Sequence, residues 1–270
     1  MAQTERELRR VPLPLQFRLL EVLRVTRLSP EMIRVTLGGP ELQGFQSPSA
    51  DDHVRVFFPT PGERKPLMPS VGPRGLVFPE GKPRPVSRDY TPRRHDAARG
   101  ELDLDFVLHG TGPASTWATQ AKPGDLLGVG GPRSSVLIPH DFDWYLMVGD
   151  STALPAIGRW MEELPAGARA IALIEVANAD EEQQFNTRAQ AQVIWLHRNG
   201  AEAGSTPLLE DALRNLQFPP GDFFTWLAGE ANTLRTLREY LVEERKVDKK
   251  WLSVSGYWKR NTADHHEPHD

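Results

Sequence analysis

Residues 101–118 read ELDLDFVLHGTGPASTWA and contain the pattern that decides the fold of the first half of the chain. The strand period places Leu102, Leu104, Phe106 and Leu108 on one face of a strand, and Asp103 and Asp105 on the other. A glycine-containing turn follows, and Pro113 suits the first position of a helix. A strand, a glycine turn and a helix start in this order are typical of phosphate sites, because the first turn of a helix presents free N–H groups.

Short strand-like runs continue on both sides of this stretch. Gly and Pro separate the runs, and regular short strands with turn signals between them indicate a β-barrel or a β-sandwich. We expect strands at residues 19–26, 33–37, 53–58, 102–108 and 126–130.

From residue 141 onward the pattern changes to continuous apolar strands separated by helical periodicity, which predicts a parallel sheet covered on both faces. Strands are expected at 144–148, 170–176, 192–197, 223–228 and 251–255, and helices at 153–164 and 230–246. The prediction is an α+β two-domain protein, with an antiparallel β-barrel domain over residues 1–140 and an α/β domain over residues 141–270. By analogy of fold alone, this order of domains suggests a flavin reductase.

The composition narrows the class of protein. A formal net charge of -4 argues against a nucleic-acid partner. The absence of cysteine excludes disulfides, thiolate metal sites and iron–sulfur clusters. No apolar run reaches the roughly 18 residues of a membrane-spanning helix, and the charged start MAQTERELRR lacks a secretory signal. We expect a cytoplasmic monomer that does not insert into membranes.

Positive charge is concentrated between residues 81 and 100, which indicates an anion site in an otherwise acidic protein. Within this region, the segment RPVSRDYTPRR places Arg88 and Tyr90 on one face of a strand. A flavin dinucleotide requires a cation for its pyrophosphate, an aromatic partner for its ring and a polar group near the flavin nitrogen, and Arg88, Tyr90 and Thr91 supply these. The alternative is an edge strand with an exposed arginine and a half-buried tyrosine.

The glycine turn after His109 and the expected helix start near Pro113 are a second candidate for flavin binding. Gly112 permits a close approach of the backbone, and Ser115 is placed to cap a phosphate as well as the helix. The glycine spacing is not that of a Rossmann motif. His109, at the end of the expected strand, is either part of this site or a structural histidine.

The segment VGDSTA at residues 148–153 ends the first strand of the second half and opens a helix. The phosphates of a nicotinamide nucleotide would lie at this helix start, beside Asp150, Ser151 and Thr152. An ordinary strand–helix turn with a capping Asp or Ser is the alternative.

The choice between NADH and NADPH stays open on the sequence. Glu175 ends the second strand of this half, where an acidic side chain often binds the ribose of NADH and repels a 2′-phosphate. Arg188 and Arg198 would instead favour NADPH.

Seven segments together resemble the siderophore-interacting protein family, which comprises FAD-binding ferric siderophore reductases related to the ferredoxin reductases. They occur in the family's order from the first domain to near the C-terminus. Two positions depart from the family's pattern, because Ser151 stands where an acidic residue is typical and Asn261 where glycine is frequent. The segments are ADDHVRVFFP (50–59), RPVSRDYTPRR (84–94), ELDLDFVLHGTGPASTWA (101–118), PGDLLGVGGPRSS (123–135), VGDSTALPAI (148–157), LAGEANTLRTLREYL (227–241) and SGYWKRN (255–261).

The resemblance implies a set of cofactor-binding residues and a reaction. Hydride would pass from NADH or NADPH to FAD, and single electrons would then reduce a ferric siderophore and release Fe(II) for iron assimilation. No catalytic acid, base or nucleophile is expected, and no metal ligand. The implied FAD contacts are Arg88, Tyr90, Thr91, His109, Gly112, Ala114, Ser115 and Thr116, with Gly229 and Glu230 beside the nicotinamide and Tyr257 near the flavin.

An anionic ferric siderophore requires a basic surface near the flavin edge. Four cations are candidates for this surface, and ordinary solvated charges are the alternative for each. They are Lys65, Arg133, Lys259 and Arg260.

Two other functions stay open on the sequence. One is a flavin reductase of another acceptor, such as a quinone, free flavin or an iron–sulfur partner. The other is a siderophore-binding protein without turnover.

The histidines of the C-terminal tail resemble a metal cluster. His265, His266 and His269 lie in a polar terminal segment without a flanking core, and we interpret them as solvated rather than metal-binding.

Overall fold

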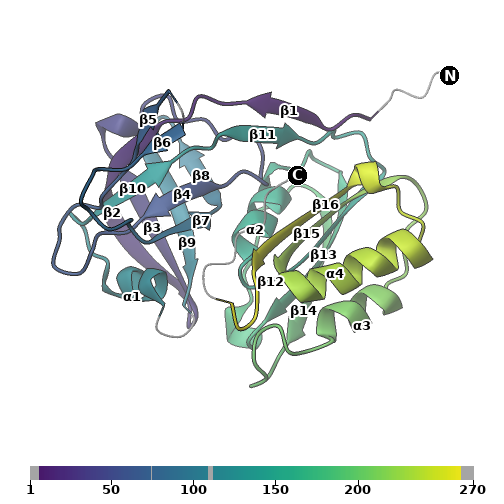
Figure 1. The fold of residues 1–270 in the computed structure, drawn as a ribbon. Helices are drawn as coiled ribbons and strands as arrows, with labels where there is room; N and C mark the ends of the chain where they lie inside the picture. Colours follow the sequence, from purple (N-terminus) through teal and green to yellow (C-terminus); the bar gives the residue numbers. More distant parts are fainter. Residues whose placement is uncertain (1–5, 74, 109–111, 263–270) are drawn as a thin grey trace. The chain divides into compact units, whose positions relative to one another are not determined.

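Two compact units make up the chain in the computed structural model, which describes residues 6–73, 75–108 and 112–262 (Figure 1). One unit is Arg9–Leu137, and the other is Ile138–Asp270 together with Met1–Leu8. Arg6 explains why the start of the chain belongs to the second unit. Its guanidinium donates hydrogen bonds to Asp222 Oδ2 at 2.6 Å and to the carbonyl of Asp141 at 2.8 Å.

The first unit is built on a seven-stranded antiparallel sheet with the order β7-β4-β10-β2-β3-β9-β8. Its two edge strands, β7 (Ser87–Tyr90) and β8 (Pro92–Asp96), are separated in the chain by Thr91 alone. The two edges of the sheet therefore lie together, as in a barrel, and the predicted antiparallel β-barrel is confirmed. The inner strands are β4 (Val54–Phe57), β10 (Leu126–Gly130), β2 (Phe17–Ser29), β3 (Met32–Gly38) and β9 (Glu101–Val107).

The alternation in β9 shows how the sheet encloses its core. Leu102, Leu104 and Phe106 are fully buried and belong to the apolar cluster of the first unit. Burying a side chain of this size stabilises a fold by about 1.5–3 kcal/mol. Asp103 and Asp105, on the opposite face of β9, are buried as well, with 2% and 3% of their surface exposed. Carboxylates at such positions require close partners.

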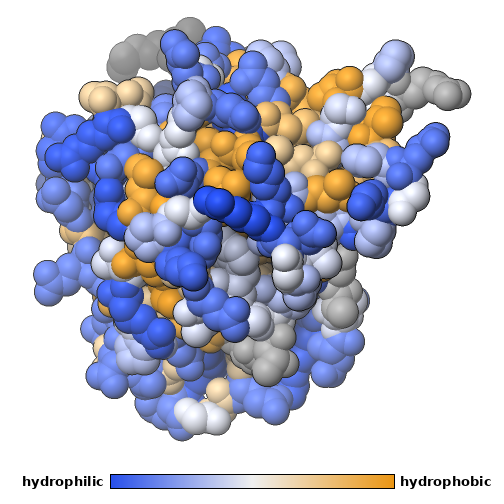
Figure 2. Space-filling model, turned by 90° about the vertical axis from the view of Figure 1, so that its left-hand side faces the viewer, coloured by the Kyte–Doolittle hydropathy of each residue, from blue (hydrophilic) through white to orange (hydrophobic). Residues whose placement is uncertain are grey.

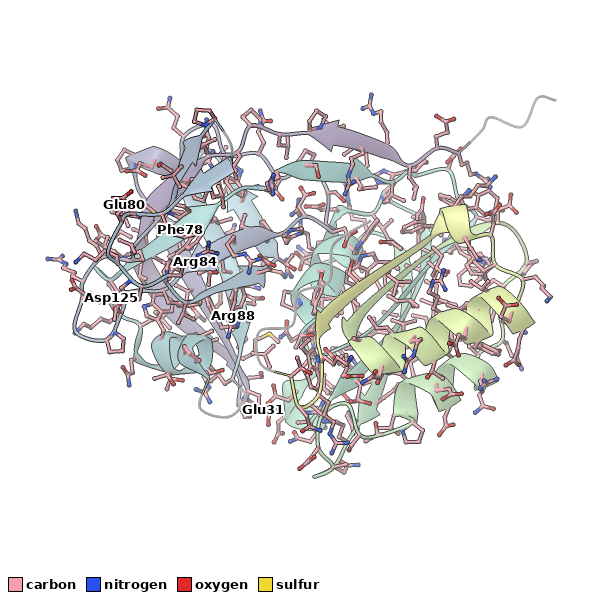
Figure 3. The ribbon with its side chains drawn as sticks, viewed as in Figure 1. Glu31, Phe78, Glu80, Arg84, Arg88 and Asp125 are labelled. Carbon is pink, nitrogen blue, oxygen red and sulfur yellow. The ribbon has the colours of Figure 1, made fainter. Side chains whose placement is uncertain are left out.

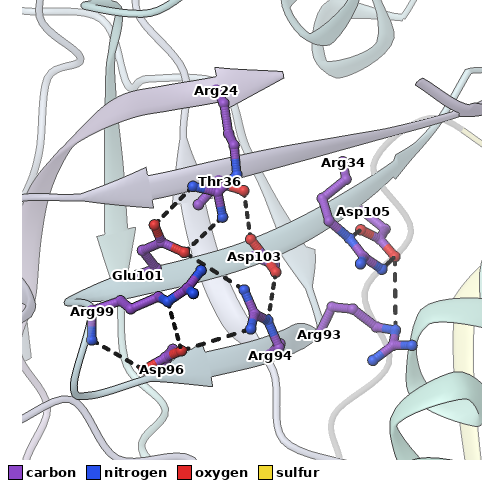
Figure 4. A network of polar contacts seen from close by, with 10 residues as sticks. All are labelled: Arg24, Arg34, Thr36, Arg93, Arg94, Asp96, Arg99, Glu101, Asp103 and Asp105. Atoms are coloured by element: carbon purple, nitrogen blue, oxygen red, sulfur yellow. Dashed lines mark hydrogen bonds and ion pairs between the residues drawn. The ribbon is translucent and has the colours of Figure 1, made fainter. Parts of the chain in front are cut away.

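Arginines from neighbouring strands are those partners (Figure 4). Asp105 accepts two hydrogen bonds from Arg34, at 2.7 and 2.8 Å. Asp103 accepts one from Thr36 Oγ1 at 2.6 Å and one from Arg94 Nε at 2.9 Å. Since each buried carboxylate has a cation and hydrogen bonds, both faces of β9 can be covered.

The remaining elements of the first unit are short. Strand β1 (Arg9–Pro12) pairs with β11 (Ser134–Leu137), and β5 (Ser70–Gly72) forms a hairpin with β6 (Gly75–Val77). Helix α1 (Pro113–Gln120) begins at the proline predicted as its first residue.

The second unit contains the predicted parallel sheet, which has five strands in the order β14-β13-β12-β15-β16. Strands β13 and β14 follow β12 on one side, whereas β15 and β16 lie on its other side, so the strand order reverses between β12 and β15. In α/β proteins, ligands bind at the carboxyl ends of the strands at such a reversal. The strands are β12 (Trp144–Asp150), β13 (Arg169–Val176), β14 (Gln190–His197), β15 (Phe223–Glu230) and β16 (Leu252–Trp258).

Helices cover both faces of this parallel sheet (Figure 1). On one face lies α2 (Leu154–Glu163), whose Trp160 ring is 6.0 Å from that of Phe224. On the other face, leucines of α3 (Leu208–Asn215) and α4 (Ala231–Glu239) pack into a cluster with the sheet. A π-helical turn, Tyr240–Glu244, continues α4, so the helix predicted over residues 230–246 is present. Helix α3 is not among the helices predicted from the sequence.

Three short 3-10 turns complete the described elements, at Pro40–Leu42, Ala179–Glu181 and Lys249–Trp251. None of the helices in the described part of the chain is both long enough and apolar enough to cross a bilayer.

We predict that Asp103→Ala lowers the free energy of unfolding by about 2–3 kcal/mol, because Thr36 and Arg94 each lose a hydrogen-bond acceptor in a poorly hydrated place. Urea unfolding measures the change. Arg99→Ala is the matched control, because Arg99 is 69% exposed and lies 3.8 Å from Asp96, and its loss is expected to cost less than about 1 kcal/mol. Equal losses for the two variants would contradict a stabilising role for the buried network.

Candidate functional site

Strand β7 positions the first candidate residues for FAD. It pairs with β4, so that Tyr90 lies opposite Val54 and Arg88 opposite Val56. Arg88 is half-buried, and its Nη1 donates to the carbonyl of Ser87 at 2.7 Å; Figure 3 labels its position on β7. The predicted sharing of one strand face by Arg88 and Tyr90 is thus present.

Tyr90 packs its ring on the core of the barrel. The ring lies 4.3 Å from that of Phe106 and 6.5 Å from that of Phe58. Burial raises the pKa of Tyr90, and the positive charge of Arg88 opposes this rise, so the phenol stays protonated near neutral pH. Thr91 is buried at the junction of β7 and β8, and Pro92 begins β8.

Helix α1 begins without a side-chain cap and without an acidic residue in its first turn. Its N-cap residue is Gly112, and a Cβ added there would meet no atom within 4 Å. A helix start without a side-chain cap can bind an anion, because its N–H groups and dipole favour negative charge. Ala114, in the same first turn, is half-buried.

The side chain of Ser115 does not cap this helix start. Ser115 is 6% exposed, and its hydroxyl donates to the carbonyl of Val107 at 3.4 Å. Thr116 is exposed, and its N–H closes the first helical turn on the carbonyl of Gly112 at 2.9 Å. His109, the remaining predicted contact of this segment, lies outside the described residues.

These residues fit FAD on the evidence of the structure alone. An arginine on an edge strand and an uncapped helix start suit a pyrophosphate, and a tyrosine packed on the core suits a flat ring system. The basic stretch of residues 81–100 is not one continuous anion surface, however. Arg93, Arg94 and Arg99 lie in ion pairs with Asp96, Glu101, Asp103 and Asp105.

In the second unit, Asp150 occupies the carboxyl end of β12 and is 4% exposed. Its Oδ1 accepts hydrogen bonds from Thr152 N at 2.8 Å and Thr152 Oγ1 at 2.5 Å. Its Oδ2 accepts from Glu230 N at 3.0 Å and from the indole Nε1 of Trp258 at 2.8 Å. A Cβ on Gly229 would lie 2.6 Å from Oδ2, so glycine is needed there to make room for this carboxylate.

Glu230 caps α4 and is 3% exposed. Its carboxylate accepts hydrogen bonds from Thr233 N at 2.8 Å and from Arg260 N at 3.1 Å. Burial disfavours the charged carboxylate, but the hydrogen bonds from Thr233, Arg260 and Asn232 together outweigh burial and lower the pKa of Glu230. The carboxylate thereby holds the chain that follows β16.

Glu175 lies beside Asp150 in the register of β12 and β13 and is 3% exposed. Burial raises the pKa of this carboxyl, against the opposing effects of a hydrogen bond from Thr206 and the charge of Arg198. Thr206 Oγ1 donates to it at 2.6 Å, and Arg198 Nη1 lies 3.7 Å away. Glu175 is therefore engaged within the protein.

The other predicted contacts of this unit lie near the same strand ends. Ser151 is half-buried, and its hydroxyl donates to the carbonyl of Glu175 at 3.5 Å. Tyr257, on β16, is half-buried, and its ring lies 6.4 Å from that of Trp226. Asn261 has a φ of 61°, which explains why glycine is frequent at this place and why asparagine is tolerated there.

The four predicted substrate cations differ in their engagement. Lys65 and Arg133, in the first unit, and Lys259, in the second, are exposed, and none of the three has a salt bridge to another described residue. Arg260 forms a salt bridge of 2.6 Å with Glu202. Its charge is therefore partly neutralised.

The residues that support the candidate site through hydrogen bonds, such as Trp258 and Thr206, were not predicted from the sequence. The bond from Trp258 to Asp150 joins residues 108 positions apart, and that from Thr206 to Glu175 joins residues 31 apart. No local pattern signals such pairs. The one available signal was the coincidence of acidic residues at the ends of three predicted strands.

A β-barrel with a cation on its edge strand and an open helix start, together with a parallel α/β unit, defines an FAD-dependent oxidoreductase of the ferredoxin-reductase type. Comparison with known proteins makes this class specific. The model of the siderophore-interacting FAD-binding domain matches residues 21–136, and that of the siderophore-interacting protein matches residues 142–261. The chain belongs to the siderophore-interacting protein family, as the sequence analysis predicted.

Named relatives and a solved structure match almost the whole chain. The NADPH-dependent ferric-chelate reductase of Escherichia coli (strain K12) is 38% identical over 96% of this chain and 99% of that protein. Ferric vibriobactin reductase ViuB of Vibrio cholerae is 33% identical over 93% of each. The crystal structure of a siderophore utilization protein from T. fusca is 43% identical, with a TM-score of 0.90, and covers 96% of this chain and 99% of that chain.

We predict that Arg88→Ala raises the Kd for FAD by about 10- to 100-fold, because a charge-assisted hydrogen bond contributes about 1.5–3 kcal/mol. Titration of the flavin-free protein with FAD, followed by flavin fluorescence, measures this Kd. Arg84→Ala is the matched control, because the exposed Arg84 lies over the Phe78 ring at 5.0 Å. Equal weakening by both substitutions would remove the special role of Arg88.

We predict that Glu230→Gln lowers the free energy of unfolding near neutral pH by about 1–3 kcal/mol, through the lost hydrogen bonds. A carboxyl with a lowered pKa contributes stability that is present above its ordinary pKa of 4.5 and is lost as the pH falls through the folded-state pKa. The difference between the variant and the natural chain should therefore shrink as the pH falls below 4.5. Urea unfolding over a pH series measures it, with Glu243→Gln at an exposed site as the control. A difference that grows on acidification would contradict the prediction.

Proposed function

We propose that this chain is a reductase of ferric siderophores that uses NAD(P)H and FAD. The observation that carries the proposal is the match of both halves of the chain, in order, to the two domains of the family. Two curated relatives that span nearly the whole chain are named ferric reductases. The chemistry supplied by bound FAD is the conversion of a two-electron donor into single-electron reduction of Fe(III).

Residues of the first unit would hold the flavin. Arg88 and the N–H groups at the start of α1 are suited to its pyrophosphate. Tyr90, supported from below by Phe106, provides an apolar surface for its ring. The buried Thr91 fixes the junction from which these side chains project.

Residues 138–270 would receive the electron donor at the carboxyl ends of β12, β15 and β16. The strand order reverses between β12 and β15, and ligands of α/β proteins bind at the carboxyl ends of the strands beside such a reversal. The buried carboxylates of Asp150 and Glu230 fix the strand ends and the backbone of Arg260. The chain's own side chains thus position the donor and the substrate rather than exchange protons with them.

The substrate would bind through cations that the protein does not neutralise. In the first unit the candidates are the exposed Lys65 and Arg133, and in the second unit the candidate is the exposed Lys259; each suits an anionic ferric complex. Iron is cargo here and needs no protein ligand, because the hard oxygen ligands of a siderophore favour Fe(III) and hold Fe(II) less tightly.

The segment between β4 and β7, to which Lys65 belongs, also exposes apolar side chains. Its β5–β6 hairpin exposes Val71, Leu76 and Val77, by 59%, 47% and 53%. Figure 2 shows apolar side chains at the protein surface, bordered by hydrophilic ones. A mixed basic and apolar surface suits a ligand with an organic body and a charged metal centre. We further assign the protein to the cytoplasm, where NAD(P)H is available, and expect a monomer on size-exclusion chromatography.

The decisive experiment is an anaerobic assay with the FAD-loaded protein, NADH or NADPH, a panel of ferric siderophores and an Fe(II) trap. Bleaching of the flavin by the nucleotide, followed by Fe(II) formation faster than without enzyme, is the expected result. Bleaching without Fe(II) formation, together with rapid reduction of quinones, would identify a reductase of another acceptor. Retention of siderophore without bleaching would identify a binding protein.

We predict that Lys259→Ala raises the KM for an anionic ferric siderophore several-fold, by about 1 kcal/mol of lost attraction, while the flavin content stays unchanged. Arg260→Ala should raise it less, because Glu202 already neutralises Arg260. The same assay, run over a range of siderophore concentrations, measures both. A larger effect at Arg260 than at Lys259 would reverse the assignment.

A further inference from the structure

The exposed Lys259 stands in the chain between two residues that buried carboxylates hold in place. Before it, the indole N–H of Trp258 donates to Asp150 Oδ2 at 2.8 Å. After it, the backbone N–H of Arg260 donates to Glu230 Oε1 at 3.1 Å. The two acceptor residues are 4% and 3% exposed, so the chain on either side of Lys259 is tied to the interior of the second unit.

The main chain at Lys259 forms a tight turn over residues 259–262. Thr262 N donates to the carbonyl of Lys259 at 3.1 Å, and the two residues also pair in an isolated β-bridge. Asn261, at the third position of the turn, has a φ of 61°. Glycine and asparagine adopt this conformation readily, whereas β-branched residues avoid it. The course of the turn therefore depends on its own hydrogen bond and on the residue at position 261.

A β-bulge in β16 determines where this turn begins. Gly256 pairs with Gly229 in the regular register, but the next pair is Trp258 with Glu230. Tyr257 is thus the extra residue on β16, and such a bulge redirects the side chains beside it. Strand β16 ends at Trp258, so the bulge and the indole hydrogen bond act on the same residue.

The turn carries two cations with different surroundings. Arg260 forms a salt bridge of 2.6 Å with Glu202, whereas Lys259 has no salt bridge to another described residue. A lysine side chain is flexible, and an anion that binds it must order both the side chain and the backbone that carries it. If the backbone is already fixed, less conformational entropy is lost on binding. A fixed turn therefore strengthens the attraction of Lys259 for an anion.

We infer that Trp258 is a positioning residue for recognition of the ferric substrate: its hydrogen bond to Asp150 fixes the turn of residues 259–262, which presents Lys259 to an anionic complex. Trp258 acts through Lys259 and is assigned no contact with the substrate. The inference rests on the proposed function, since it concerns the substrate of that reaction. It attributes the preference for anionic over neutral ferric complexes to the geometry of the turn as well as to the charge of Lys259.

The variant Trp258→Phe tests the inference, because it removes the indole N–H and keeps an aromatic ring. The FAD-loaded protein is assayed anaerobically with anionic ferric EDTA and with neutral iron(III) tris-acetohydroxamate, using an Fe(II) trap and whichever of NADH and NADPH bleaches the flavin faster. The readout is the ratio of the two kcat/KM values, anionic over neutral, because a change in flavin reduction affects both complexes equally. We expect this ratio to fall about two- to fivefold, through a higher KM for the anionic complex. An unchanged ratio overturns the inference.

Trp251→Phe is the matched control. The indole N–H of Trp251 has no hydrogen-bond partner among the described residues, and Trp251 immediately precedes β16. Its substitution is expected to leave the ratio unchanged. A fall of the same size in both variants would mean that any tryptophan lost from this part of the chain has the effect, and would count against Trp258.

A pair of variants at Asn261 tests the turn without changing Trp258 or Lys259. Asn261→Val disfavours the positive φ and should lower the ratio, whereas Asn261→Gly permits this φ and should retain it. Asn261 is exposed, so the pair remains informative even if Trp258→Phe does not fold. Equal ratios for the two variants would contradict a role of the turn in substrate recognition.

The double variant Trp258→Phe with Lys259→Ala separates positioning from an independent effect. If Trp258 acts through Lys259, its substitution lowers the ratio no further once Lys259 is absent. A second fall, as large as that in the single variant, would show that Trp258 acts without Lys259 and would overturn the inference.

A binding measurement gives a readout that does not depend on turnover. Gallium(III) EDTA, an anionic complex that the flavin does not reduce, is titrated into the FAD-loaded protein by calorimetry. Its Kd should rise in Trp258→Phe by about the same two- to fivefold factor and stay unchanged in Trp251→Phe. Equal Kd values for Trp258→Phe and the natural chain would argue against the inference.

Failure of the inference and failure of the proposed function give different results. If the natural chain with bound FAD reduces neither ferric complex with NADH or NADPH, the proposed function fails. If the natural chain reduces them and Trp258→Phe shows the same ratio, only the inference fails.

Discussion

The carboxylate of Asp150 is the acceptor on which the ligand edge of the second unit depends. It joins the ends of β12, β15 and β16 by accepting hydrogen bonds from Thr152 N, Glu230 N and Trp258 Nε1. Without an acceptor here, each of these poorly hydrated N–H groups would be unsatisfied, which would lower the free energy of unfolding by about 1–3 kcal/mol per group. The need for glycine at 229 follows from the same carboxylate. One buried charge thus determines the backbone course of three strand ends.

The two helix starts of the chain show how one such charge changes the chemistry of a common motif. Both α1 and α2 follow a strand and carry proline in their first turn. At α1 the N-cap is Gly112, and a Cβ added there would meet no described atom within 4 Å. At α2 the corresponding space contains a carboxylate. The first arrangement is able to receive a phosphate, whereas at the second the N–H and hydroxyl of Thr152 already donate to Asp150.

The sequence predicted the elements whose signal is local. The alternation in β9 and the apolar strands from Trp144 onward were visible because side-chain burial repeats with a fixed period. Helix α3 was missed because it is only eight residues long and follows a loop without a clear cap. The barrel was predicted as a fold class, but the order of its strands was not, since that order depends on the pairing of strands distant in the sequence.

The candidate site was predictable as a set of residues but not as an arrangement. Arg88 and Tyr90 share a face, as the strand period requires. The inward turn of Ser115 and the engagement of Glu175 could not be foreseen, because both depend on partners from other elements.

Charge shows the limit of sequence most directly. Arg93, Arg94 and Arg99 look in the sequence like part of an anion site, yet they lie in ion pairs with the carboxylates beside them. Lys65 and Lys259 have no such partner among the described residues. A cation attracts an anionic ligand strongly only if no carboxylate of the protein already lies beside it. In an ion pair the neighbouring carboxylate offsets the positive charge that the ligand would meet. The pairing, and not the number of cations, therefore separates the candidate binding residues of this protein from the structural ones.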